Sequence, residues 1–317
     1  MKRECSVCEG DLEERELSYD GYDIYRCGTC SHRQLYPIPS DEDIHKYYSQ
    51  QSDTIGNANA FRNIEDYLGG KDTFHQFYLR RLKQIFKFKS LQSSSLKFLE
   101  VGSGPGCFLA LLRDFYEFTN LTGIDISQQI VDEGRKRLGI NLYAGDAGEM
   151  EEYPNAPFDF VYCYHSLEHC KDPLKIVSKI YKNIVKGGEV FLSVPNYKGF
   201  FGSLSKERWY WILPPSHIHY FTKQSMTYML KKAGFENCSV RTEIVSTAGA
   251  LPADIVRTFF AVACRQRIGT LSKSMVSTGY AKIYFADIVS RIIASPLLFY
   301  MWITNSFDSL NVHAKKE

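Results

Sequence analysis

Four cysteines in the first 30 residues have the spacing of a metal site. Cys5 and Cys8 form one C-x2-C pair, and Cys27 and Cys30 form a second pair after eighteen intervening residues. Each pair can present two thiolates to one tetrahedral ion, so the two pairs together complete a set of four ligands. Because such a site keeps no open coordination position, the spacing predicts structural Zn²⁺ and not a catalytic metal.

The cysteine-rich segment, residues 1–40, carries more acidic than basic side chains. It holds five Lys/Arg and eight Asp/Glu, a balance of −3. Binding of nucleic-acid phosphates depends on clustered positive charge. We therefore do not expect this segment to bind nucleic acid, and a packing or substrate-shaping role fits it better.

A glycine-rich turn lies between an expected strand and an expected helix. Residues 96–101 have the pattern of a short buried strand, residues 102–106 read Gly-Ser-Gly-Pro-Gly, and an apolar helix pattern follows over 107–112. Strand, glycine turn and helix open a Rossmann-like unit. The glycines let the backbone approach a ligand closely, and the helix N-terminus offers free N–H groups.

His165, Glu168 and His169 follow a later expected strand, which ends near Tyr164. Ligands of open α/β sheets bind beyond the carboxyl ends of the strands, so this segment should border the substrate. One of the histidines could deprotonate a substrate hydroxyl as a general base. Alternatively, the three side chains could hold a divalent metal that polarises the hydroxyl, or Glu168 and His169 could only orient the loop.

A second histidine segment, residues 214–222, reads P-P-S-H-I-H-Y-F-T and precedes an expected helix over 223–233. We expect His217 or His219 to contact substrate; alternatively, one of them caps the helix or packs under Tyr220. An aromatic lid or wall is expected just before this segment, from Trp209, Tyr210 and Trp211.

Six segments of the chain, in order, resemble the motifs of class I S-adenosylmethionine (SAM) methyltransferases. Residues 100–106 are similar to the family's E/D-x-G-x-G-x-G motif and differ from the G-x-G-x-x-G spacing of dinucleotide-binding turns. The resemblance covers about residues 96–248, and residues 307–316 are similar to the family's terminal strand. The other matching segments are 121–127, 144–147, 158–164, 185–196 and 233–245.

The resemblance implies which residues bind SAM. Asp125 would accept hydrogen bonds from the ribose hydroxyls, Asp146 would lie beside the adenine amino group, and Glu100 would place negative charge near the cationic end of SAM. For Asp125 and Asp146, helix capping or turn formation is the alternative interpretation. The remaining implied cofactor contacts are Gly102, Ser103, Gly104, Gly106, Ile126, Ala147 and Tyr164.

The two histidine segments resemble one group within this family, which includes ubiquinone-pathway O-methyltransferases and sugar methyltransferases. Its segments read H-x-x-E-H-x-x-D-P and P-x-H-x-x-x-F-T, and His217 matches the histidine of the second one best. Ubiquinone-type members have Glu where this chain has His165. This difference argues against assigning the metal site of those members to this chain.

We therefore expect an α/β fold: a Rossmann-like sheet of seven strands, the seventh antiparallel, with an N-terminal zinc ribbon and a helical insertion near the C-terminus. The expected divisions are a ribbon over 1–40, a helical linker and cap over 41–95, a SAM-binding core over 96–249, the insertion over 250–305 and a terminal strand over 306–317.

The expected insertion is apolar and basic, with six Lys/Arg against two Asp/Glu over 250–305. It could form a lid, a homo-oligomer interface or a contact with an anionic membrane surface. The whole chain of 317 residues is 44% hydrophobic and 23% charged, which is the composition of a globular and not of a disordered protein. Its net charge of +2 gives no strong attraction to nucleic acid. Without a secretory pattern after Met1, we expect a cytoplasmic protein, peripheral to the inner face of the membrane if the insertion contacts lipid.

The predicted function is SAM-dependent methyl transfer, to an oxygen of a small molecule or of a nucleotide- or lipid-linked sugar, with a histidine as general base. Three alternatives stay open: a zinc-ribbon rRNA methyltransferase, a sugar C-methyltransferase, and a SAM-binding protein without catalysis. The acidic ribbon argues against the first. The intact glycine motif and Asp125 argue that SAM binding is kept.

Overall fold

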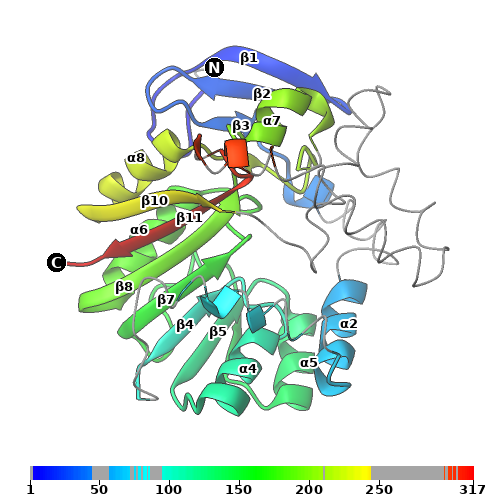
Figure 1. Ribbon diagram of the computed structural model, residues 1–317, viewed down its shortest axis with the longest axis vertical. Helices are drawn as coiled ribbons and strands as arrows, with labels where there is room; N and C mark the ends of the chain where they lie inside the picture. The colour runs from blue at the N-terminus through cyan, green and yellow to red at the C-terminus, as the bar shows by residue number, and fades with distance from the viewer. Residues whose placement is uncertain are drawn as a thin grey trace.

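A computed structural model describes residues 3–44, 57–71, 95–209, 211–243 and 306–317, with separate positions between 75 and 85 and between 296 and 304. In this part of the chain the strands form two sheets, one of seven strands and one of four (Figure 1). The larger sheet has the strand order β10-β11-β8-β7-β4-β5-β6.

The seven-stranded sheet is parallel except for β11, which runs antiparallel to both β8 and β10. This arrangement confirms the expected Rossmann-like sheet with an antiparallel seventh strand. Its central strands are buried along most of their length, as expected for strands covered on both faces. In chain order the strands are β4 (Phe98–Val101), β5 (Leu121–Asp125), β6 (Leu142–Ala144), β7 (Phe158–Tyr164), β8 (Ile184–Pro195), β10 (Asn237–Glu243) and β11 (Ser309–Lys315).

Helices cover both faces of this sheet. One hydrophobic cluster joins α2 (Asn57–Leu68) and α4 (Cys107–Tyr116) to Phe98 and Phe160, and α5 (Gln128–Leu138) belongs to the same layer. A second cluster joins α6 (Pro173–Asn183) and α8 (Lys223–Ala233) to Leu99 and Val161, whose side chains point to the opposite face.

Local sequence explains where these helices begin. The Asp172 side chain accepts a hydrogen bond from the Lys175 amide and Pro173 opens α6, so this helix starts where the Asp-Pro pair predicts. Thr222 and Ser225 form a capping box at the start of α8. Helix α8 thereby fixes the end of the second histidine segment.

The four-stranded sheet contains the cysteine-rich segment and one strand of the core. Its order is β1 (Leu12–Tyr19), β2 (Tyr22–Cys27), β3 (Arg33–Leu35) and β9 (His219–Tyr220). Strand β9 comes from the second histidine segment and pairs with β3, so the ribbon and the core share a sheet. A common hydrophobic cluster includes Ile24 and Leu35 of the ribbon and Trp209, Ile212 and Ile218 of the core.

Several expectations lie outside the described residues. These are almost all of the insertion over 250–305, much of 41–95, and Tyr210, so the domain boundaries and the roles considered for the insertion stay predictions. Within the described ranges, no helix is both long and apolar enough to cross a membrane. Two short helices, α7 (Phe200–Ser205) and η1 (Lys206–Arg208), follow β8.

Candidate functional site

The glycine turn after β4 adopts a backbone conformation that other residues rarely take. Gly102, Gly104 and Gly106 have φ values of 72°, 53° and 79°, in the left-handed region that glycine enters without a Cβ penalty. The amides of Gly102 and Ser103 both donate to the Ile124 carbonyl, at 2.8 and 3.1 Å. A Cβ on Gly102 would overlap the hydroxyl of Ser166, in the loop after β7, and lie 2.6 Å from its Cβ. The turn is therefore closed against that loop.

Asp125 lies at the end of β5 and faces this turn. Its Oδ2 accepts a hydrogen bond from the Gly104 amide at 2.8 Å, and its Oδ1 accepts one from the Ser127 amide at 3.0 Å. Burial raises the pKa of Asp125. The turn-forming role considered from the sequence is thus present, but each carboxylate oxygen can accept a further bond. The next side chain, Ile126, is 75% exposed and offers an apolar surface beside the carboxylate.

The end of β6 places Asp146 at the same edge of the sheet. Asp146 is exposed, and its Oδ1 accepts a hydrogen bond from the Gly148 amide at 2.7 Å. Ala147 beside it is buried. The carboxyl ends of β4, β5, β6 and β7 therefore bring together the residues that the SAM resemblance named.

Glu100 is almost fully buried and is paired with a residue that the sequence did not single out. Arg81 Nη2 lies 3.2 Å from Glu100 Oε1, and Arg81 Nε donates to the Tyr162 hydroxyl at 2.6 Å. Burial raises the pKa of Glu100 to about 8 although Arg81 opposes the shift. The other oxygen, Oε2, has no hydrogen-bond partner among the described residues. Together with the open acceptor capacity of Asp125, this buried oxygen fits the ammonium and hydroxyl donors of SAM.

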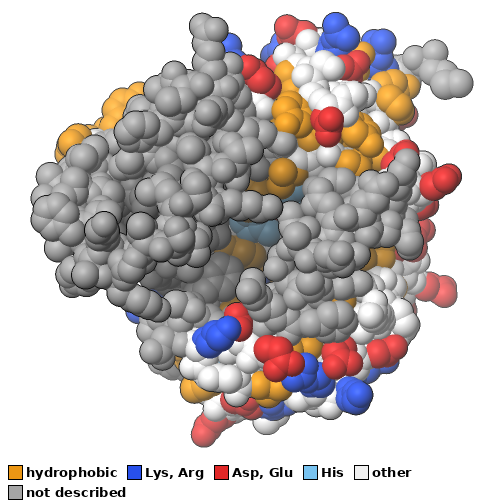
Figure 2. All heavy atoms as spheres, turned by 90° about the vertical axis from the view of Figure 1, so that its right-hand side faces the viewer, with side chains coloured by type: hydrophobic (Ala, Val, Ile, Leu, Met, Phe, Trp, Pro, Cys, Tyr) orange, Lys and Arg blue, Asp and Glu red, His pale blue; other side chains and the backbone are white. Residues whose placement is uncertain are grey.

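The two histidine segments meet around Glu168, whose side chain is fully buried. His165 Nδ1 lies 3.1 Å from Glu168 Oε1. The ligand atoms of Glu168, His169 and His217 all lie within 4.8 Å of one another. Burial alone would raise the pKa of Glu168, but the neighbouring imidazoles outweigh it and lower the pKa to about 2. Glu168 is therefore a carboxylate at neutral pH. Figure 2 shows histidine side chains near the centre of this face, beside hydrophobic side chains.

Burial weakens two of the four histidines as proton acceptors. Burial lowers the pKa of His217 to about 3 and that of His219 to about 4, so both are neutral and weakly basic at pH 7. His169 Nδ1 lies 2.9 Å from the Ser216 carbonyl and 3.1 Å from its hydroxyl. Neither ring nitrogen of His165 has a hydrogen-bond partner among the described residues, and its Nδ1 lies 3.1 Å from Glu168 Oε1.

These contacts also define which side chains could hold a metal at this site. A carbonyl only accepts hydrogen bonds, so His169 Nδ1 carries the proton and its Nε2 lone pair is available as a ligand. The group whose atoms converge is Glu168, His169 and His217. It differs from the trio considered from the sequence, because His217 takes the place of His165.

The aromatic residues expected as a wall separate into different roles. Trp211 stacks on His217, with ring centroids 5.4 Å apart, and lies 5.1 Å from His165. Trp209 is fully buried and packs on Tyr197. Trp211 therefore borders the histidine cluster, whereas Trp209 belongs to the hydrophobic core.

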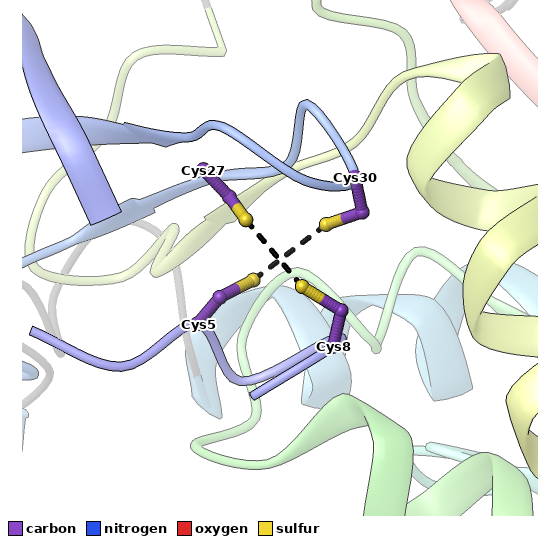
Figure 3. A group of neighbouring side chains, drawn as sticks. All are labelled: Cys5, Cys8, Cys27 and Cys30. Atoms are coloured by element: carbon purple, nitrogen blue, oxygen red, sulfur yellow. Dashed lines mark hydrogen bonds between the residues drawn. The ribbon is translucent and has the colours of Figure 1, made fainter. Parts of the chain in front are cut away.

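The cysteine cluster has the shape of a tetrahedral metal site (Figure 3). The four Sγ atoms lie within 4.8 Å of one another, with 3.7 Å between Cys5 and Cys30 and 3.4 Å between Cys8 and Cys27. A tetrahedron with Zn–S bonds of about 2.3 Å has edges of about 3.8 Å. The amides of Val7 and Gly10 point at the sulfurs of Cys5 and Cys8, a supporting shell that suits thiolate ligands. The residues present fit Zn²⁺.

Comparison with known proteins agrees with this arrangement. The family model "Methyltransferase domain" matches residues 72–240, just over half of the chain. A 2-methyl-6-phytyl-1,4-hydroquinone methyltransferase of Oryza sativa is 26% identical over 157 residues, which are 48% of this chain and 44% of that protein. A ubiquinone biosynthesis O-methyltransferase of Pseudomonas aeruginosa is 29% identical over 105 residues, 32% of this chain and 44% of that protein.

Among solved structures, a phosphoethanolamine N-methyltransferase 2 of Haemonchus contortus, in complex with phosphomonomethylethanolamine and S-adenosylhomocysteine, superposes with a TM-score of 0.51. The match covers 90% of this chain and 62% of that one at 18% identity, so it supports the fold alone. The chain spans less than two thirds of the length of the relatives named above. The matched family model, the seven-stranded sheet and the groups at its strand ends together show that the chain belongs to the class I SAM-dependent methyltransferases.

Proposed function

We propose that the protein transfers the methyl group of SAM to a hydroxyl oxygen of a small molecule or sugar, with His165 as the general base. The observation that carries this proposal is the pair formed by His165 and the buried carboxylate Glu168, with 3.1 Å between Nδ1 and Oε1. The pair lies directly after β7, next to the glycine turn, where methyl donor and acceptor would meet.

Bound SAM supplies a methyl group on a positively charged sulfur. The glycine turn, Asp125 and Glu100 would hold it through close backbone approach and hydrogen bonds. Glu168 Oε1 lies 3.1 Å from His165 Nδ1. This carboxylate favours the tautomer with the proton on Nδ1, which leaves the Nε2 lone pair to take the proton of the acceptor hydroxyl. As the O–C bond forms and the S–C bond breaks, the buried carboxylate stabilises the positive charge on the imidazole. This orientation of an imidazole by a carboxylate follows the logic of a catalytic dyad.

A divalent metal is the second candidate for activating the acceptor. It is favoured by one observation: Glu168, His169 and His217 converge, and the Ser216 carbonyl fixes the His169 tautomer that leaves Nε2 available. A metal there would lower the pKa of a bound hydroxyl as a Lewis acid. The two mechanisms compete for Glu168, because the same carboxylate would have to orient His165 and bind the ion.

The acceptor class is inferred from the relatives and from the rings around His165. One relative is named as a hydroquinone methyltransferase and another as a ubiquinone biosynthesis O-methyltransferase. The His165 ring lies between those of Tyr164 and Trp211, with centroids 4.5 and 5.1 Å away. We propose a phenolic or sugar hydroxyl as the acceptor, and a structural zinc in the ribbon. The negative charge of residues 1–40 supports a small-molecule acceptor over RNA.

The test begins with titration of SAM and S-adenosylhomocysteine by calorimetry, followed by transfer of tritiated methyl from SAM to phenols, catechols and nucleotide sugars. His165→Gln should lower turnover about 100-fold or more and leave SAM affinity within about twofold. His313→Gln is the matched control, because His313 pairs with Glu189 in the sheet away from the cluster.

Two results would overturn the proposal in different ways. Normal turnover in His165→Gln would exclude His165 as the base. If turnover instead requires His169 and is lost on addition of a chelator under conditions that leave ribbon zinc in place, the metal alternative holds.

A further inference from the structure

His32 lies two residues after Cys30 and joins the cysteine ribbon to the second histidine segment. Its side chain is fully buried, and its Nε2 lies 3.0 Å from His219 Nδ1. The His32 ring also contacts Phe221, with 4.9 Å between centroids. Its carbonyl accepts a hydrogen bond from the Cys27 amide, so the position of the His32 ring is tied directly to the cysteine cluster.

The segment that His32 contacts supports the backbone of Glu168. The amides of Ile218 and His219 both donate to the Glu168 carbonyl, at 2.8 and 3.1 Å. Two residues earlier, Ser216 provides the carbonyl that faces His169 Nδ1. The placement of Glu168 and His169 therefore depends on where residues 216–219 lie.

The SAM side of the site, the glycine turn with Asp125, is held by backbone hydrogen bonds that do not involve residues 216–219. The amides of Gly102 and Ser103 donate to Ile124, and the Gly104 amide donates to Asp125. All of these partners belong to the seven-stranded core. A displacement of the ribbon should thus disturb the acceptor side and leave these hydrogen bonds of the SAM side in place.

We propose that His32 is a positioning residue for methyl transfer: through its hydrogen bond to His219 it holds residues 216–219, and with them Glu168 and His169, in the arrangement that the reaction needs. The ribbon is then a support of the acceptor side. This inference rests on the proposed function, because Glu168 and His169 matter for catalysis only if that site transfers the methyl group.

The contact is suited to this role because both rings are buried, so solvent does not compete for the bond. Across the 3.0 Å contact one ring nitrogen donates and the other accepts, which couples the tautomers of the two rings.

The experiment compares the full chain with its His32→Phe and His32→Gln variants, all loaded with zinc. Phenylalanine keeps a ring and removes the hydrogen bond, whereas glutamine keeps an N–H donor close to the place of Nε2. His313→Phe is the control for loss of a histidine contact elsewhere in the fold. Amide hydrogen exchange is followed by NMR at Ile218 and His219, with Gly102 and Ser103 as internal references.

In His32→Phe, exchange at Ile218 and His219 should be about fivefold to tenfold faster or more, as expected for loss of one buried hydrogen bond. Exchange at Gly102 and Ser103 and the affinity for SAM should stay within about twofold. The imidazole ¹⁵N resonances of His169 and His217 should shift in His32→Phe and return toward their original values in His32→Gln. With an acceptor found by the transfer assay, KM for that acceptor should rise while KM for SAM does not.

Unchanged exchange and unchanged imidazole resonances in His32→Phe would overturn the proposal. Loss of the whole fold in both variants would overturn it as well, because a residue that acts on one loop should not unfold the SAM-binding sheet. Failure of the unsubstituted protein to bind SAM would instead refute the proposed function, and the exchange comparison could still be made.

Discussion

Replacing Gly102 by alanine should destabilise the protein more than the same change at Gly104. Both residues have left-handed φ values, 72° and 53°, so each substitution carries a backbone cost of about 1–2 kcal/mol. Their surroundings differ. A Cβ on Gly102 would lie 2.6 Å from Ser166 Cβ, whereas a Cβ on Gly104 would have nothing within 4 Å. The extra cost at Gly102 is that of overpacking, about 1–3 kcal/mol.

The assay is urea unfolding without SAM, which keeps ligand contacts out of the comparison. The free energy of unfolding of Gly102→Ala should be lower than that of Gly104→Ala by about 1–3 kcal/mol. Adding Ser166→Gly to Gly102→Ala should remove most of this difference, because the overlapping side chain is then gone. The same addition to Gly104→Ala should have a much smaller effect.

Equal free energies for the two alanine variants would refute the reasoning. So would a double substitution at 102 and 166 that recovers nothing. Either result would mean that the loop after β7 does not lie against the glycine turn. The SAM side and the acceptor side of the proposed site would then not be in contact.

Three further results are expected. Asp125→Ala should weaken SAM binding about tenfold or more by calorimetry, because charge-assisted hydrogen bonds contribute about 1.5–3 kcal/mol; unchanged affinity would contradict the ribose assignment. Compared with His217→Gln, the unsubstituted protein should lose free energy of unfolding as the pH is lowered from about 6.5 to 3, because burial lowers the pKa of His217 from 6.5 to about 3 and the unfolded chain binds its proton first. Compared with Glu168→Gln, it should lose free energy of unfolding below about pH 5, because the pKa of Glu168 is about 2 against 4.5 unfolded. The comparison with each variant separates these effects from that of Glu100, whose raised pKa of about 8 acts in the opposite direction. Cys27→Ser should lower bound zinc, measured by metal analysis, and reduce the melting temperature, whereas Cys238→Ser, outside the cluster, should change neither.

The seven-stranded sheet could be predicted because a short stretch of sequence indicates each of its strands. Each motif contains a strand with a glycine or an acidic residue at its end, as in 98–106 and 121–125, and short-range sequence determines such units. The strand order then follows from the family that these motifs resemble. The Asp-Pro start of α6 is another local signal that the structure bears out.

The contacts between distant segments could not be predicted in this way. Strand β9 has two residues and no hydrophobic alternation, so nothing in its sequence indicates that it pairs with β3. Arg81 belongs to no motif, and its bond to Glu100 depends on how separate elements pack. His217 joins Glu168 and His169 from a different segment, which is why the converging trio differs from the one considered from the sequence. The roles assigned to these residues stay predictions.

The pairing of β3 with β9 sets an order of events during synthesis. His32 and His219 are separated by 187 positions. At about 5–20 residues per second, the ribosome needs about 10–40 seconds to make the intervening chain. During that time Ile24 and Leu35, which the finished protein buries completely, have no partner from the core. The nascent N-terminal segment must therefore either remain exposed to chaperones or rearrange once residue 220 has emerged, and its final strand pairing is a late step of folding.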